Sequence, residues 1–272
     1  MIESKQPARR ESLDAVEAIL LVAVAFLSLW TAGGWLVGAL GIAGLGVAEV
    51  LVVLAPAVLL CRARRVDLRA AFPLRLPSPR TLTGALLAGA GGFYLTAAVI
   101  EAALERVAPV PPAVREQMRR MIVPAAGMRP LAIDWVVLAL LPAVCEEALF
   151  RGALLGAFRS SRRGAATAVA ATALLFGFYH GSAWKLLPTG ALGVLLGAAA
   201  WRARSLVAPV VVHLVNNTLV ILLVRAGVED PPPPTSPTGA VLTAASLAAL
   251  ALGIHMIRPD ASKKGGIPNT TL

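Results

Sequence analysis

The sequence predicts an all-α protein, a polytopic bundle of about eight transmembrane helices. Hydrophobic residues make up 57% of its 272 residues, whereas soluble domains contain about 45–50%. The mean hydropathy is +0.76. Several apolar stretches reach or approach the length of about 20 residues that a helix needs to cross lipid. No segment has the alternating polarity of a barrel strand, and an isolated spanning segment satisfies its backbone only as a helix.

Each apolar stretch is bounded by charged or turn-forming residues. The predicted spans lie near 15–35, 42–61, 82–103, 131–150, 165–184, 187–201, 205–225 and 238–257. The first resembles a secretory signal because Lys5, Arg9 and Arg10 precede it, but no small-residue cleavage site follows Trp30, so we expect a membrane anchor. We therefore expect residues 1–272 to form a single integral membrane domain, with a flexible tail at 259–272.

The formal net charge of +10 has two possible explanations, nucleic acid or a membrane surface. The basic residues cluster at the ends of apolar runs, and no basic stripe is interleaved with aromatic residues. We therefore expect the lipid bilayer as a partner and no nucleic acid. Two cysteines, Cys61 and Cys145, lie in apolar stretches, so we expect them to be reduced and buried, with neither a disulfide framework nor a metal-binding motif.

The placement of the charges predicts the topology. With the N-terminus inside, most basic residues fall in inside segments, as the positive-inside rule expects. These residues are Lys5, Arg9, Arg10, Arg62, Arg64, Arg65, Arg69, Arg75, Arg80, Arg159, Arg162, Arg163, Arg202, Arg204, Arg258, Lys263 and Lys264. The prediction is a multi-pass protein of the cell (inner) membrane with both termini cytoplasmic. Most outside charges lie in 104–130, which we interpret as an amphipathic interfacial segment with a helix starting at Pro111-Pro112.

Three short pieces place ionisable groups inside apolar stretches: 145–151, 176–180 and 213–217. A charge at membrane depth costs from about 3 to more than 10 kcal/mol by different estimates. On helices, the four-residue spacing puts Glu147 with Arg151, Phe176 with His180, and His213 with Asn217 on common faces. A polar site shared between helices is the simplest way to offset these costs.

Each residue also has a purely structural interpretation. Glu147 and Arg151 can form an intrahelical ion pair, Glu146 can reach water at the interface, and His180 or His213 alone can be a core histidine with satisfied hydrogen bonds. Two adjacent carboxylates point about 100° apart on a helix, so one salt bridge does not serve both. Two of the three histidines in the chain also lie mid-span. Together these facts favour a functional site.

A buried carboxylate, imidazoles and an amide suit the hydrolysis of an acyl bond. A base must take a proton from water, and donors must meet the oxyanion as it forms. No Gly-x-Ser-x-Gly motif or activated thiol is evident. Water is therefore the nucleophile that fits best.

Glu-Glu-x-x-x-Arg at 146–151, Phe-x-x-x-His at 176–180 and His-x-x-x-Asn at 213–217 follow one another on successive spans. In this order they resemble the CPBP family of intramembrane proteases, which includes the CAAX prenyl endopeptidases and the bacteriocin-immunity (Abi) proteins. The similar core covers about 131–222, the predicted spans four to seven. The resemblance implies a CAAX-protease-like fold and an intramembrane endopeptidase acting on a membrane-associated peptide or protein.

The resemblance also implies a role for each residue. Glu146 and His180 would activate the attacking water, and His213 and Asn217 would stabilise the oxyanion. As supporting residues, Glu147 would pair with Arg151, and Phe176 would pack behind His180. We expect no cofactor and no metal; the alternative is a zinc enzyme with Glu146, His180 and His213 as ligands, although the His-Glu-x-x-His spacing of zinc peptidases is absent.

Two other functions compete with the protease. One is a non-catalytic immunity or scaffold protein of the same fold, and the other is a transporter that uses the same charges, although no internal repeat supports it. Glu49 lies in the second predicted span, outside the shared core, and the sequence does not explain it. The sequence does not distinguish a prenylated substrate from one that carries another C-terminal anchor.

Overall fold

A computed structural model of the chain describes residues 9–124, 127–161, 164–228 and 231–258. Within these ranges every regular element is a helix, which confirms the predicted all-α class. The predicted flexible tail at 259–272 lies outside the described residues.

The N-terminal third forms a helical hairpin. Its first arm runs without a break through α1 (Ala15–Ser28), a π-helical stretch (Leu29–Gly33) and α2 (Gly34–Leu40). Gly41, with φ +60°, makes the turn. The second arm contains α3 (Ile42–Ala48), a π-helical stretch (Glu49–Leu54) and α4 (Ala55–Ala63). Asp14 caps α1 and Glu17 completes the capping box, which fixes the start of the first arm.

The rest of the chain supplies the other helices of the bundle. Those before the centre of the chain are α5 (Leu68–Ala71), α6 (Pro79–Leu95), a π-helical stretch (Thr96–Glu101), α7 (Ala102–Val107) and α8 (Pro112–Ile122). One long run then comprises α9 (Leu131–Asp134), a π-helical stretch (Trp135–Leu140), α10 (Leu141–Glu147), another (Ala148–Leu154) and α11 (Leu155–Ser160). The last helices are α12 (Ala165–Tyr179), α13 (Ala183–Ala203), α14 (Val207–Arg225) and α15 (Pro237–Met256).

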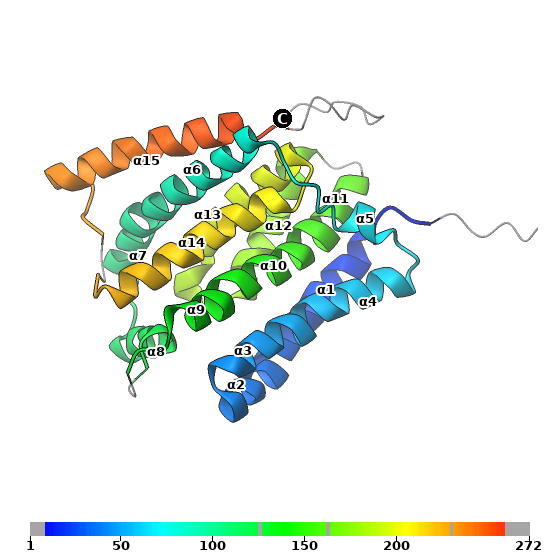
Figure 1. Cartoon of the computed structure of the whole chain (residues 1–272), viewed down its shortest axis with the longest axis horizontal. Helices are drawn as coiled ribbons and strands as arrows, with labels where there is room; N and C mark the ends of the chain where they lie inside the picture. Colours follow the sequence, from blue (N-terminus) through cyan, green and yellow to red (C-terminus); the bar gives the residue numbers. More distant parts are fainter. Residues whose placement is uncertain (1–8, 125–126, 162–163, 229–230, 259–272) are drawn as a thin grey trace, which may run out of the picture.

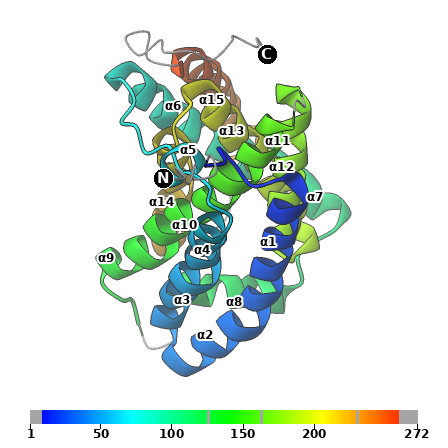
Figure 2. The same cartoon turned by 90° about the vertical axis from the view of Figure 1, so that its right-hand side faces the viewer.

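The long run 131–160 is central to the packing. It contacts the N-terminal hairpin on one side and α12, α13 and α14 on the other. Beyond α14, helices α6 and α15 complete the bundle, as Figure 1 shows. Gly84 and Gly253 allow close contact between α6 and α15, because an added methyl group at Gly84 would lie 2.7 Å from the Gly253 carbonyl oxygen. Figure 2 gives the same arrangement from the side.

All eight predicted spans coincide with helices, and six of the described helices are long and apolar enough to cross a membrane by themselves: 15–40, 42–63, 79–107, 183–203, 207–225 and 237–256. The protein is therefore a multi-pass membrane protein. The remaining two predicted spans, the fourth and the fifth, are not among these six. Helix α12 has 15 residues and ends at Tyr179, five residues before the predicted end of its span. The run 131–160 carries four charged side chains in its first 21 residues: Asp134, Glu146, Glu147 and Arg151.

The sixth predicted span is longer than the sequence indicated. Helix α13 extends from Ala183 to Ala203, and Pro188 lies inside it. This helix is rich in Gly and Ala, and Gly193 is a contact position, since an added methyl group there would lie 3.0 Å from Ala173 Cα. Small residues let membrane helices approach closely, so the composition reflects helix packing.

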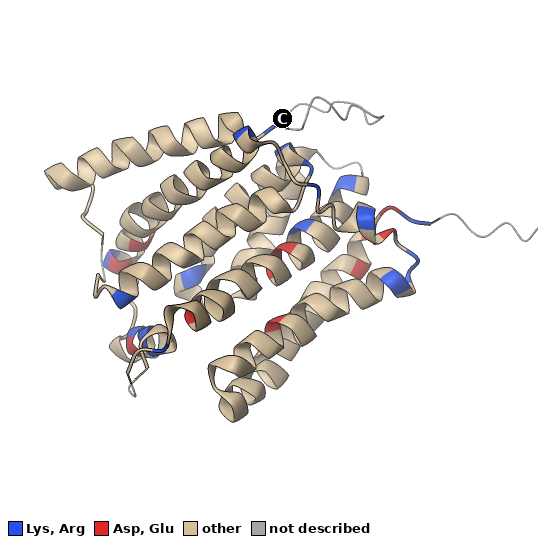
Figure 3. Cartoon of the chain, in the orientation of Figure 1, with Lys and Arg blue, Asp and Glu red and all other residues tan. Residues whose placement is uncertain are grey.

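Charged residues gather mainly at the two ends of the helices, with a few between them (Figure 3). At one end, α14 is fastened to the central run: Asp134, with 0% exposure, binds Arg225 at 2.6 Å and Arg129 at 2.7 Å. At the opposite end, Arg202 binds the Ile257 carbonyl and Arg159 lies over the Trp201 ring. Arg159 and Arg202, both predicted to lie inside, therefore lie at the same end of the bundle.

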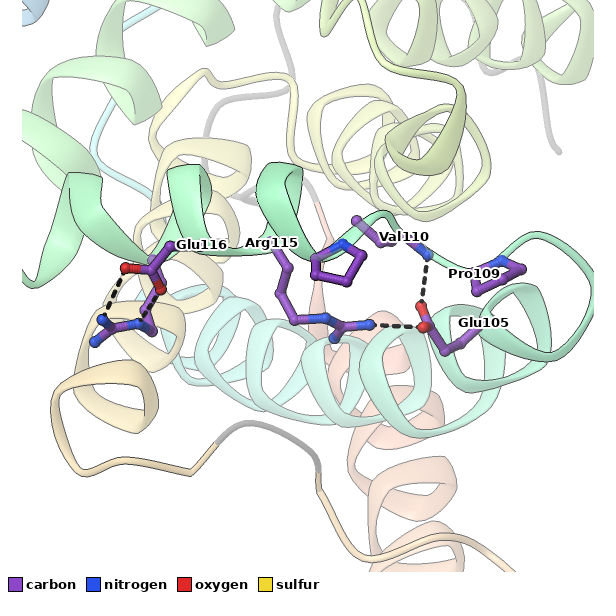
Figure 4. A pocket seen from close by; sticks show the side chains of 7 residues that line it. Glu105, Pro109, Val110, Arg115 and Glu116 are labelled. Carbon is purple, nitrogen blue, oxygen red and sulfur yellow. Dashed lines mark hydrogen bonds and ion pairs between the residues drawn. The ribbon is translucent and has the colours of Figure 1, made fainter.

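Helix α8 starts at Pro112, as predicted, within the segment 104–130. Glu105, Pro109, Val110, Pro112, Arg115, Glu116 and Arg119 line a surface cavity of about 370 Å³ at the corner between α7 and α8 (Figure 4). Arg115 binds Glu105 at 2.6 Å across this corner. Glu116 accepts hydrogen bonds from Arg119 and Arg120, which lower the pKa of its carboxyl to about 2. The interfacial position of this segment stays a prediction.

Candidate active site

The central run carries a buried cluster of charged side chains. Glu146 and Glu147 end α10, and Arg151 follows in the π-helical stretch. Their exposed fractions are 7%, 0% and 4%. The surrounding side chains include Leu149, Phe150 and Phe176, all buried. Charges in such an environment need partners, because an isolated buried charge is strongly unfavourable.

Glu147 joins two helices through one oxygen. Its Oε1 lies 2.9 Å from Arg151 Nη1 and 3.0 Å from His213 Nδ1. The Arg151 guanidinium also donates from Nη2 to the Gly193 carbonyl at 3.1 Å, which adds α13 to the network. The predicted pair Glu147–Arg151 is thus present, and it additionally fixes His213, 66 positions away in the sequence.

His213 lies in α14 with an exposed fraction of 3%. The neighbouring Glu147 carboxylate can only accept, so the tautomer with the proton on Nδ1 is the one that donates a hydrogen bond to it. The other nitrogen, Nε2, then lies 3.9 Å from Glu146 Oε2. That oxygen is buried and has no hydrogen-bond partner among the described residues. The gap between the imidazole and the Glu146 carboxylate is therefore the polar centre of the site.

His180 follows directly after the last residue of α12. Its Nδ1 lies 2.9 Å from the Phe176 carbonyl, one turn earlier, so a proton on Nδ1 leaves Nε2 as the acceptor. The next residue, Gly181, has φ +59°, and a methyl group there would overlap the Trp30 indole. Glycine is needed at this position on both grounds. The N-terminal hairpin thus packs against the turn that follows His180.

Phe176 brings the parts of the site together. Its ring is buried and meets His180 edge-on at 4.9 Å and His213 at 5.9 Å between ring centroids. The Arg151 guanidinium carbon lies 4.5 Å from the same centroid, within cation–π range. Phe150 packs against the ring from another side at 5.0 Å. Phe176 therefore packs against His180, as the resemblance implied, and also against His213 and Arg151.

Asn217 lies one turn after His213 on α14, so the two side chains share a face. Its Oδ1 accepts a hydrogen bond from Asn216 Nδ2 at 3.1 Å, which leaves its own amide donors available. Among the described residues no hydrogen bond joins Asn217 to Glu146, His180 or His213. The nearby hydrogen bond from Trp135 Nε1 to Thr218 Oγ1, 3.0 Å long, ties this part of α14 to the central run.

The donor set does not form a metal centre as arranged here. In the part of the chain that the structure describes, no three His, Cys, Asp or Glu side chains come together as metal ligands. One nitrogen of His213 is already occupied by Glu147. The zinc alternative therefore depends on measurement of the metal content. Cys61 and Cys145 are free and buried.

Sequence reasoning missed several contacts. The hydrogen bond between His213 and Glu147, the Gly193 carbonyl as acceptor, and the packing of Trp30 on Gly181 all join distant parts of the chain. Glu49 was noticed but unexplained; it is buried, with 3% exposure. Its position inside an apolar span was the signal that could have placed it near the site.

Comparison with known proteins finds one related family. The family of type II CAAX prenyl endopeptidase Rce1-like proteins matches residues 128–219. That stretch contains all three motifs and every residue of the cluster described above. Comparisons with curated proteins and with solved structures gave no match. The resemblance drawn from the motifs is confirmed over these residues: this stretch of the chain is similar to CAAX-type proteases of the CPBP family.

Proposed function

We propose that this protein hydrolyses a peptide bond of a membrane-associated or C-terminally anchored substrate with water as the nucleophile. The observation that carries the proposal is the alignment of His213 between two carboxylates, 3.0 Å from Glu147 and 3.9 Å from Glu146. A histidine oriented by one carboxylate and facing a second, unpartnered one is an arrangement suited to acid–base chemistry.

Glu146 is the proposed general base. It takes one proton from water with the help of His180 Nε2, and the resulting hydroxide oxygen bonds to the carbonyl carbon of the scissile peptide. The tetrahedral intermediate then breaks its carbon–nitrogen bond, and the proton on Glu146 passes to the leaving amine. This cycle returns Glu146 to its ionised form and consumes one water molecule.

His213 and Asn217 are the proposed donors to the oxyanion. Donation from His213 Nε2 requires the ring to carry both protons, and the Glu147 carboxylate at Nδ1 supplies the counter-charge. The amide donors of Asn217 are available because its oxygen is the atom bound to Asn216. Loss of one such donor lowers kcat by about 10²–10³-fold in other hydrolases.

Substitution of the proposed base tests the mechanism. Glu146→Gln and His180→Ala in the full chain, reconstituted in lipid vesicles, should each abolish cleavage while the protein stays folded. Glu105→Gln is a matched control, because this glutamate lies on the surface between α7 and α8. Retained turnover by Glu146→Gln would exclude it as the base.

The substrate is best found by comparing proteomes. Membrane and secreted proteins from cells with the native chain and with Glu146→Gln should differ in peptides cut near a membrane anchor. Uncleaved precursors should accumulate in the Glu146→Gln cells, and mass spectrometry of these precursors shows whether their anchors are prenyl groups. No difference, together with solute uptake by vesicles that contain the protein, would instead support a transporter; no difference and no uptake would support a scaffold or immunity role.

Metal dependence and topology have separate tests. We propose a metal-free mechanism, so purified protein should hold less than stoichiometric zinc and chelators should leave cleavage unchanged. We also propose cytoplasmic termini, because the basic residues at the α4, α11 and α13 ends lie on one side of the bundle. A fluorescent protein fused after the C-terminus should then fluoresce, whereas an alkaline phosphatase fusion should be inactive.

A further inference from the structure

Glu49 is a buried carboxyl that the three motifs do not include. It lies in the second arm of the N-terminal hairpin, where α3 passes into a π-helical stretch, and only 3% of it is exposed. Its Oε2 atom is buried and has no hydrogen-bond partner among the described residues. Nor does any ion pair in the described part of the chain involve Glu49. It therefore neither reaches the membrane surface nor neutralises a nearby cation.

The packing of the hairpin directs this residue toward α10. A methyl group added to Gly46 would lie 3.1 Å from Leu141 Cδ1 and 3.7 Å from Val137, so α3 lies against the central run there. The two helices run in the same direction, as Figures 1 and 2 agree. One turn further along each helix, Glu49 therefore comes level with Cys145 and Glu146. The electrostatic interactions of Glu49 with Cys145 and Glu146 agree with this register.

Tyr179 closes the same region from α12. Its hydroxyl is buried without a hydrogen-bond partner in the described residues, and it interacts electrostatically with both Glu146 and Glu49. Three helices thus each contribute one unpaired buried oxygen to a common region. Buried polar groups are normally hydrogen-bonded, and ordered water supplies the bonds that the protein does not.

We propose that Glu49 is a positioning residue for Glu146: from the second membrane helix it holds the Glu146 carboxylate toward His213 through water bound between Glu49, Glu146 and Tyr179. This inference rests on the proposed role of Glu146 as the base. It extends the active site to the N-terminal hairpin, outside the matched residues 128–219.

The surroundings define how Glu49 acts. The titratable groups that face it are Cys145, Glu146 and Tyr179, and none of them carries a positive charge. Beyond Glu146 lie Glu147, Arg151 and Lys185, which interact with Glu146. An ionised Glu49 would face the Glu146 carboxylate without a neighbouring cation to balance the two negative charges. Glu49 therefore acts as the neutral acid, which can donate a hydrogen bond. Glutamine has nearly the same shape and can donate the same bond.

The first experiment tests proximity without activity. Glu49→Cys, combined with Cys61→Ser, leaves the introduced thiol and the native Cys145 as the only sulfhydryl pair. A short bifunctional thiol reagent should link residues 49 and 145 in membranes, detected as a cross-linked peptide by mass spectrometry. Val50→Cys, whose native side chain is 39% exposed, is the control and should not cross-link. Equal linking from both positions, or none from position 49, would overturn the proposed register.

The second experiment compares Glu49→Gln with Glu49→Leu. We expect Glu49→Leu to lower kcat about 10–100-fold with an unchanged KM, because a misplacement of about 1 Å can have such an effect. Glu49→Gln should keep kcat within a few-fold of the native value. The melting temperature of Glu49→Leu should change little, because the apolar side chain avoids the cost of burying the Glu49 carboxyl and this offsets the lost water-mediated hydrogen bond. Val53→Ala, one turn along the same helix, should lower the melting temperature and leave kcat unchanged.

The outcomes separate this inference from the proposed function. Full activity of Glu49→Leu together with an inactive Glu146→Gln would refute the role of Glu49 alone. An active Glu146→Gln would refute the base and the positioning role together. Equal loss in Glu49→Gln and Glu49→Leu would show that the charge, not the hydrogen bond, is needed, and would also overturn the inference.

Discussion

Replacing Arg151 with methionine should destabilise the protein far more than its single ion pair suggests. The guanidinium binds Glu147 at 2.9 Å and the Gly193 carbonyl at 3.1 Å, and it lies over the Phe176 ring. Methionine keeps much of the apolar stem but leaves the Glu147 carboxylate with His213 as its only described partner. Removal of one member of a buried pair typically costs about 3–5 kcal/mol.

A double-mutant cycle makes this magnitude testable. Arg151→Met, Glu147→Gln and the double variant are compared with the native chain by detergent-induced unfolding in bicelles. Because both side chains are fully buried, we expect the double variant to be less destabilised than the sum of the single variants, by about 1–3 kcal/mol. Leu149 lies between the two residues in the sequence and is also buried, so Leu149→Ala is a control for the loss of packing alone.

The result that refutes this reasoning is additivity. If Arg151→Met costs under about 1 kcal/mol and its effect simply adds to that of Glu147→Gln, the two charges do not stabilise each other in the bundle. The pair would then resemble an exposed salt bridge, whose contribution is about 0–1 kcal/mol.

Three further predictions follow from single positions. Gly181→Ala should lose most activity and lower the melting temperature, since the left-handed backbone and the Trp30 ring leave no room for a methyl group; a fully active variant would show that the turn after His180 can move freely. Asp134→Asn should destabilise the protein by about 3 kcal/mol in the same bicelle assay, because two arginines lose their common partner, and a change under about 0.5 kcal/mol would contradict the burial of this carboxylate. The Glu116 side chain, with its pKa lowered to about 2, should stay ionised in the folded protein as the pH falls from 7 to 4, while its contribution to stability declines below the ordinary pKa of 4.5 and is lost as the pH falls through 2. Carbon NMR with Glu116→Gln for assignment measures this titration, and a midpoint near 4.5 would rule out the ion pairs of α8.

Contacts within one helix of the site were predictable from the sequence, whereas contacts between helices were not. Local spacing predicted the pair Glu147–Arg151 and the common face of His213 and Asn217, because both depend only on helix geometry. The approach of Phe176 to His180 followed from the same spacing and from the family resemblance. The long-range hydrogen bond between His213 and Glu147 was not predictable, since helix periodicity does not tell which faces of α10 and α14 meet.

The helix boundaries also depend partly on the local sequence and partly on contacts between helices. Apolar composition located all eight helices, but α12 ends earlier and α13 begins earlier than hydropathy indicated. The boundary between them is set by His180 and Gly181, where the turn is fixed by contact with Trp30. Hydropathy does not detect such a contact, because it averages over residues and ignores partners from other helices.

The sequence by itself determined the membrane class, the helical fold and the ionisable residues on which the family resemblance rests, because each depends on composition or on spacing within one helix. Only the tertiary structure decided which of those residues meet and how: that His213 lies between Glu147 and Glu146, and that the N-terminal hairpin brings Glu49 toward the same carboxylate. The physical reason is that helix–helix contacts in lipid depend on the shape and polarity of whole faces. No single segment of the chain contains that information.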